Sequence, residues 1–353
     1  PEWNDANNAL VGTGVSVVTL SYLRRYLAQL AQLIPTAGQE AVSREVLAWL
    51  RELSEILTQH QACLAEPVVD DRTRRAVLDA LGLAFERYRT AVYTHGLSSA
   101  EPLPHDEVHR LLTLAQAYAD HTLRANRRGD GLYHAYNLLG WAPGEARLTH
   151  LYEMLEGQVA ILSAGLLSST EAADVLDALA ASPLYRADQD SYVLYPVRAR
   201  PSFLDKNRVP AALSAQPLVA ALLAAGDRSV LEQDARGHLR FAGDLTSARD
   251  VAAALARLSA QPRWRALVES DGGALLEAWE ETFRHHEFTG RSGTMHKYEG
   301  LGCIYWHMVA KLLLAVQEQL FVAHDGGEPA VVVERLRADY LRIQRGLGYH
   351  KSP

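Results

Sequence analysis

The sequence is poor in cysteine, has no long apolar run and carries no excess of positive charge. Each absence excludes a class of protein. Of 353 residues only Cys63 and Cys303 are cysteines, with no Cys-x-x-Cys spacing, so neither a disulfide framework nor a thiolate zinc site is expected. No apolar run approaches the roughly 20 residues that span a bilayer, which predicts no membrane partner. Acidic residues outnumber basic ones by 42 to 35, and the net charge of −7 predicts no nucleic-acid partner.

What is present is the composition of a globular protein. The chain is 48% hydrophobic and 22% charged, and it is long enough for one large core or two smaller ones. It opens at Pro1, in the middle of a polar segment, so we expect an upstream part of the same polypeptide. The cysteine content fits a reducing compartment or a periplasm, and the compartment stays open.

Helical periodicity dominates the chain. Apolar residues recur at steps of three and four from Gly14 to Ile34, and Ser168 to Glu171 has the spacing of a capping box. Further helices are expected over 40–64, 72–94, 106–126, 148–167, 247–258, 263–268, 275–286, 300–320 and 330–346. Prolines and tyrosines crowd the stretch 183–217, and 230–241 has the pattern of a hairpin.

The fold class is therefore all-α. We expect a single domain over residues 1–353, built as an (α/α)6-barrel-like helical toroid that is incomplete at its N-terminal side. A small irregular insertion with some β structure is expected within it, over 183–245. The alternative architecture is an irregular helical bundle.

Four polar, aromatic segments differ from a plain helical scaffold. The first holds Trp3, Asn4, Asp5 and Asn8. An indole face covers a pyranose ring, amides and carboxylates bind hydroxyls, and a carboxyl shielded by the indole suits a general acid. A capped turn is the structural alternative.

The second segment holds Tyr133, His134, Tyr136 and Asn137, and Tyr133, Tyr136 and Asn137 lie near one face if the segment is helical. We interpret it as a pocket wall, the alternative being a helix start with core aromatics. The third, 195–207, would place Asp205, Lys206 and Asn207 against substrate in a loop over one barrel mouth, the alternative being a solvated loop with an internal ion pair.

The fourth segment, 285–307, is the richest because four glycines are interleaved with charged and aromatic side chains. Its candidate site residues are Arg291, His296, Lys297, Tyr298, Glu299, Trp306 and His307. The histidine spacing matches no metal signature, so no metal and no cofactor is expected. Arg291 near Gly290 and Gly293 could instead hold a phosphate.

Trp3-Asn4-Asp5 resembles the Asp-Trp-Asn-Asp stretch of the cellobiose-phosphorylase-type glycoside phosphorylases, and related segments of other (α/α)6-barrel glycosidases. The resemblance covers about ten residues, and Glu2 stands where the family has aspartate. It implies that Asp5 is the general acid and that Trp3 lines the sugar subsite. In these phosphorylases inorganic phosphate replaces the second carboxylate that hydrolases of the fold keep.

These segments predict a carbohydrate-active enzyme that cleaves a glycosidic bond in an oligosaccharide or polysaccharide. Asp5 would protonate the leaving oxygen and Glu299 would activate a water, with inversion if the carboxyls are about 6.5–9.5 Å apart. One alternative is phosphorolysis with phosphate held by Arg291, His296 and Lys297. Another is a non-catalytic helical carbohydrate-binding or scaffold protein.

Overall fold

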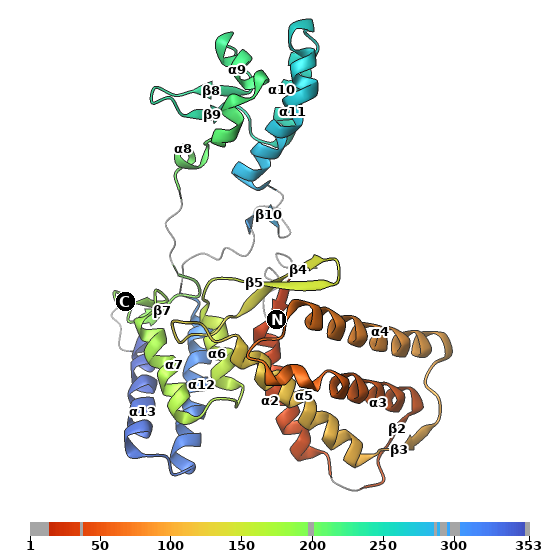
Figure 1. Ribbon diagram of the computed structural model, residues 1–353. Helices are drawn as coiled ribbons and strands as arrows, with labels where there is room; N and C mark the ends of the chain where they lie inside the picture. The colour runs from red at the N-terminus through yellow and green to blue at the C-terminus, as the bar shows by residue number, and fades with distance from the viewer. Residues whose placement is uncertain are drawn as a thin grey trace. The chain divides into compact units, whose positions relative to one another are not determined.

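The protein is mostly helical with small antiparallel sheets. The computed structural model describes residues 14–35, 38–196, 201–285, 288–289, 295–296 and 304–349. The chain divides into two compact units: unit 1 holds the residues up to 197 together with 300–353, apart from Asn4–Ala9, and unit 2 is centred on 198–299 (Figure 1). The sequence placed an insertion over 183–245, whereas the second unit extends to 299 and includes two long helices.

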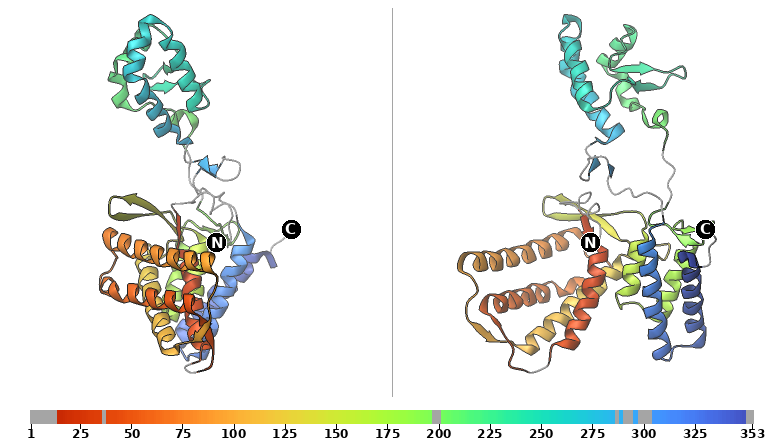
Figure 2. Two further views of the ribbon diagram at one scale, coloured as in Figure 1. Left: turned by 90° about the vertical axis from the view of Figure 1, so that its right-hand side faces the viewer. Right: turned by 180° about the vertical axis from the view of Figure 1, so that it is seen from behind.

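Unit 1 contains eight of the labelled α-helices among the described residues. They are α2 (Val17–Leu33), α3 (Arg44–Gln59), α4 (Asp71–His95), α5 (His105–Ala125), α6 (Leu155–Ser163), α7 (Ser169–Ala181), α12 (Trp306–Asp325) and α13 (Ala330–Gln344), with the short turns η1 (Gln61–Ala65) and η4 (Arg345–Tyr349). Figure 2 shows α12 and α13 packed side by side. No described helix is long and apolar enough to cross a membrane.

Three small sheets are formed by the described residues of unit 1. The largest has the order β1 (Gly14–Ser16), β4 (Tyr136–Ala142), β5 (Glu145–His150), and two hairpin-like pairs join β2 (Ala41–Ser43) to β3 (Ala100–Pro102) and β6 (Tyr185–Arg186) to β7 (Ser191–Tyr192). All are antiparallel. Strand β5 corrects one prediction: the helix expected over 148–167 begins only at Leu155, because 145–150 pair with β4 across a turn at Gly144, whose φ is +71°.

Helices α2, α6 and α12 run parallel to one another. Arg25, eight residues into α2, donates to the Ser163 carbonyl at the end of α6 (3.3 Å) and to Glu318, twelve residues into α12 (2.7 Å). Gln319 donates to the Leu162 carbonyl (2.6 Å). The N-terminal ends of α2 and α6 lie together, because the first turns of both helices contact Ala135, and Figure 2 shows α12 running in the same direction as α2. Helix α6 is the central one, because every residue from Leu155 to Leu162 is buried.

Unit 2 is a small helical unit with its own core. It comprises α8 (Phe203–Lys206), η2 (Ala211–Ala215), α9 (Pro217–Ala224), the hairpin β8 (Leu231–Gln233) to β9 (Leu239–Phe241), α10 (Ala248–Ser259) and α11 (Pro262–Phe283), followed by the pair β10 (Phe288–Thr289) and β11 (Met295–His296). The hairpin at 230–241 is confirmed. The two helices expected over 263–268 and 275–286 are one helix, α11, whose buried Asp271 accepts a hydrogen bond from the backbone of Leu218 in α9 (2.9 Å).

Candidate functional site

The N-terminal ends of α2 and α6 meet at Ala135. Its carbonyl accepts hydrogen bonds from the backbone N–H groups of Val17 (2.9 Å) and Val18 (3.3 Å) in the first turn of α2. Gly157, in the first turn of α6, lies so close that a Cβ there would be 3.0 Å from the Ala135 Cβ. The loop that carries the second predicted segment is therefore fixed between two parallel helices.

Tyr133 is buried and held through its backbone rather than its ring. The Gln158 side chain of α6 accepts from the Tyr133 N–H (2.9 Å) and donates to the Tyr133 carbonyl (2.8 Å), as a paired strand would. On its other side the segment forms a bridge to Arg127. The helical face expected for Tyr133, Tyr136 and Asn137 is thus wrong, because this segment is extended and enters β4.

Tyr136 contacts a carboxylate that the sequence analysis missed. Its hydroxyl donates to Glu156 Oε2 (3.0 Å), in the first turn of α6. Glu156 is only 3% exposed. Burial of a carboxylate is costly, and it is found here at the positive end of the helix dipole with a hydrogen-bond donor. The available sequence signal was a single charged residue in an otherwise uncharged helix.

Asn137 and His134 join a polar chain with two further residues. Asn137 donates to the Asn126 side-chain oxygen (2.8 Å), and its own oxygen lies 2.8 Å from His150 Nδ1. The His134 and His150 rings stack with centroids 4.1 Å apart and planes at 9°. Burial, the neighbouring His150 and Arg128 lower the pKa of His134 to about 4. Burial and the nearby Arg128 and Arg74 also lower the pKa of His150, so both rings are neutral at pH 7. The sequence analysis did not single out His150.

Trp306 and His307 lie in the first turn of α12, and Figure 2 shows this turn at the same end of unit 1 as the start of α2. Both are exposed, and the His307 ring stacks on Tyr305 with centroids 5.8 Å apart. The structure thus brings parts of the second and fourth predicted segments to one end of three neighbouring helices. Exposed aromatic and imidazole groups there can contact a sugar ring and its hydroxyls.

The other predicted residues are not placed at this end. Eight lie outside the described residues: Trp3, Asn4, Asp5, Asn8, Arg291, Lys297, Tyr298 and Glu299. The backbone of His296 lies in β11, and its side chain is outside the description. Among the described residues, no three His, Cys, Asp or Glu side chains are grouped to hold a metal ion.

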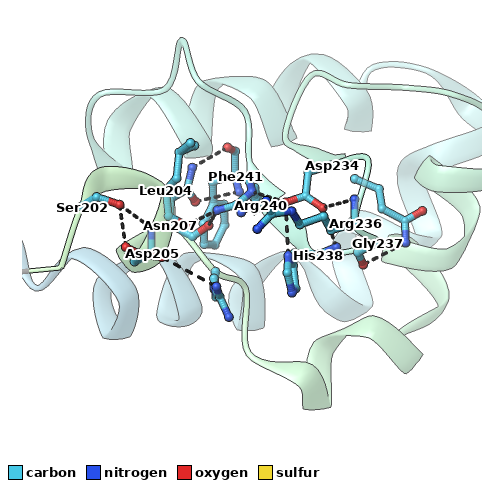
Figure 3. Close-up of polar contacts among 12 residues, drawn as sticks. Ser202, Leu204, Asp205, Asn207, Asp234, Arg236, Gly237, His238, Arg240 and Phe241 are labelled. Atoms are coloured by element: carbon cyan, nitrogen blue, oxygen red, sulfur yellow. Dashed lines mark hydrogen bonds and ion pairs between the residues drawn. The ribbon is translucent and has the colours of Figure 1, made fainter.

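Lys206 is the last residue of α8, in unit 2. Residues next to it in the chain make hydrogen bonds that hold α8 to strand β9. The Asn207 side chain makes two hydrogen bonds to the backbone of Phe241, the last residue of β9. It donates to the Phe241 carbonyl (2.9 Å) and accepts from the Phe241 N–H (3.0 Å). Figure 3 shows Arg240 between Asp234 and the carbonyls of Leu204 and Asn207. Burial raises the pKa of Asp234, but hydrogen bonds from Arg240 and nearby backbone outweigh it and hold that pKa well below its usual range.

A protein-family model matches part of the chain. Residues 200–286 match the family model described as GH149 phosphorylase insertion domain 2. The matched range coincides with unit 2, from α8 to the end of α11. No curated protein matches the chain. Unit 2 is thus similar to an insertion domain of a glycoside phosphorylase.

Proposed function

We propose that this chain is part of a carbohydrate-active enzyme of the glycoside phosphorylase type. The match of residues 200–286 to a phosphorylase insertion domain carries the proposal. An insertion domain needs a host, and unit 1 has the form of one: its chain is interrupted by unit 2 and resumes with α12 and α13, which pack on α6 and α7.

The helical host is proposed to be part of an (α/α)6-type toroid. Each of the parallel helices packs against another helix of unit 1: α2 against α5, α6 against α7, and α12 against α13, which follows it directly. A row of parallel inner helices with returning outer helices is the arrangement of that toroid. The all-round burial of α6 supports an inner position.

The reaction we favour is phosphorolysis of an oligosaccharide or polysaccharide. A phosphate oxygen would attack the anomeric carbon, the glycosidic C–O bond would break, and Asp5 would give its proton to the leaving oxygen. Arg291, His296 and Lys297 would bind the phosphate. Trp306 and His307, at the exposed start of α12, would contact the sugar. The products would be a sugar 1-phosphate and a shortened saccharide.

Hydrolysis is the second candidate, because the chain offers Glu299 as a carboxylate that could activate water. Phosphate dependence separates the two reactions. The chain would be incubated with β-1,3-, β-1,4- and α-1,4-linked glucan oligosaccharides, with and without inorganic phosphate. Sugar 1-phosphate and reducing sugar would both be measured.

Phosphorolysis predicts sugar 1-phosphate only when phosphate is present. Asp5→Asn should lower its formation by about 10²-fold or more, whereas Glu299→Gln should not remove the nucleophile. Reducing sugar released without phosphate, and lost in Glu299→Gln, would establish hydrolysis instead. Saccharide binding without turnover in either condition would favour the non-catalytic alternative.

A further inference from the structure

A cavity of about 680 Å³ lies in unit 1, between α4, α5 and the β4–β5 hairpin. Its walls are mainly aliphatic, with Val15, Val69, Val77, Leu78, Leu139 and Leu148 among the lining residues. This volume falls in the range of pockets that hold small organic molecules, roughly 300–1,000 Å³. Such pockets combine apolar walls with a few directional polar groups, so the polar groups of the lining decide what fits.

The charged groups of the lining are already paired within the protein. Arg74 donates to Asp71 (2.5 Å) and to the Ala146 carbonyl (2.6 Å). Asp70 caps α4 by accepting from the backbone N–H groups of Arg72 and Thr73, each at 2.9 Å. A charged ligand would have to displace one of these partners, so the lining favours a neutral one.

Two further polar side chains of the lining are already engaged: the Tyr118 hydroxyl donates to the Leu57 carbonyl (2.8 Å), and His121 Nε2 pairs with the Glu66 carbonyl (2.6 Å). His150 also lines the cavity, and a chain of hydrogen bonds decides which of its ring nitrogens carries the proton. The Thr122 carbonyl can only accept, so the Asn126 amide nitrogen faces it (2.8 Å) and the Asn126 oxygen faces the Asn137 nitrogen (2.8 Å). The Asn137 oxygen therefore faces His150 Nδ1, which must carry the proton (2.8 Å). In the neutral ring Nε2 is then a bare acceptor.

No donor within the described part of the chain lies at hydrogen-bond distance from His150 Nε2. A metal ion shared with His134 does not fit either. A ligated metal lies in the plane of its imidazole, and these two rings are stacked in nearly parallel planes with centroids 4.1 Å apart. The acceptor therefore suits a hydroxyl or N–H group of an organic molecule.

We propose that this cavity binds a neutral small molecule with an apolar body and one hydroxyl group, which donates to His150 Nε2. The aliphatic side chains of the lining would contact the apolar part of the ligand. The hydrogen bonds that run from Thr122 through Asn126 and Asn137 to His150 keep His150 Nε2 unprotonated, so that it can accept the ligand hydroxyl. The site is separate from the sugar-contacting residues proposed at the start of α12 and does not depend on the enzymatic activity.

The test uses two probes that differ only in the donor: 2-naphthol and 2-methylnaphthalene. Binding to the chain would be measured by ligand-observed NMR titration. We expect 2-naphthol to bind about three- to tenfold more tightly, which is the effect of one net hydrogen bond. In His150→Phe, which keeps the aromatic ring, this preference should disappear while 2-methylnaphthalene binds as before and so reports an intact cavity.

A second pair of variants locates the site. Val77→Trp places an indole in the lining of the cavity and should weaken binding of both probes at least tenfold. Leu83→Trp, on the same helix but exposed and away from the lining, should leave binding unchanged. Equal affinity for the two probes would refute the hydroxyl contact. Absence of binding, or binding unchanged in Val77→Trp, would refute the cavity as the site.

Discussion

Gln158 should be among the most stabilising polar side chains of unit 1, and Gln158→Leu tests this. The amide is fully buried and makes three hydrogen bonds, two to the backbone of Tyr133 and one to the Met154 carbonyl (3.0 Å). Leucine has a similar volume, so the substitution leaves no large cavity. It leaves the Tyr133 N–H and carbonyl buried without these partners.

The magnitude follows from those two orphaned groups. Each buried, unsatisfied backbone group costs about 1–3 kcal/mol, and the better burial of leucine offsets part of the sum. We expect unit 1 to lose about 2–4 kcal/mol of unfolding free energy. Gln319→Leu is the matched control, because Gln319 is also buried in unit 1 but donates one hydrogen bond, to Leu162. Its loss should be about 1 kcal/mol.

The assay is hydrogen exchange followed by mass spectrometry, since the chain has two units and a single melting curve would mix them. Peptides from 126–163 should lose protection in Gln158→Leu, while peptides from 201–285 should not change. A loss below about 1 kcal/mol, or one equal to that of Gln319→Leu, would refute the view that this amide secures the Tyr133 segment.

Three further predictions concern the same unit. Ser168→Ala should cost about 1 kcal/mol in urea unfolding, because Ser168 and Glu171 form a reciprocal capping box; a neutral effect would contradict the cap. Gly157→Ala should cost about 1–3 kcal/mol and lower the hydrogen-exchange protection of peptides from 126–163, because its Cβ would press on Ala135; unchanged protection there would show that α6 can shift freely. The pKa of His134 is about 4 in the folded protein and about 6.5 in the unfolded chain. As the pH falls below 6.5, the unfolded chain therefore takes up a proton at this histidine before the folded protein does. Stability due to this group is therefore complete above pH 6.5 and is lost as pH falls toward 4, by about 1–2 kcal/mol once its half exposure is allowed for, and His134→Phe should flatten that part of the pH–stability curve.

Helices whose ends are marked by local sequence signals, such as a capping box or a break in apolar periodicity, were predicted correctly. The capping box at Ser168 is confirmed, and the first helix spans Val17–Leu33 within the expected range of 14–34. The helix expected over 148–167 failed in its first part because strand pairing is a tertiary property. Residues 145–150 form β5 because they pair with β4. The spacing of apolar residues within one segment carries no information about such a partner strand.

The candidate site depends on contacts between distant residues. Tyr136 meets Glu156 twenty residues later and on a different element, so neither periodicity nor motif spacing marks the pair. The His134–His150 stack arises because β4 and β5 are paired, with Asn137 directly opposite His150. The sequence indicated that the segment 133–137 is polar and aromatic, but only the fold shows which carboxylate and which second histidine it meets.

The insertion expected over 183–245 stays a prediction, and the sequence signals differ along unit 2. Prolines and tyrosines mark its irregular first half, whereas its second half is helical and resembles the host in periodicity. The two halves nevertheless share one core: Phe241 of the hairpin packs edge-on against Trp279 of α11, with centroids 5.0 Å apart, and Trp279 packs on Phe283 at 4.3 Å. A segment that buries its own aromatic core does not draw on the core of its host, and this is the property that lets a domain interrupt a helical fold between consecutive helices.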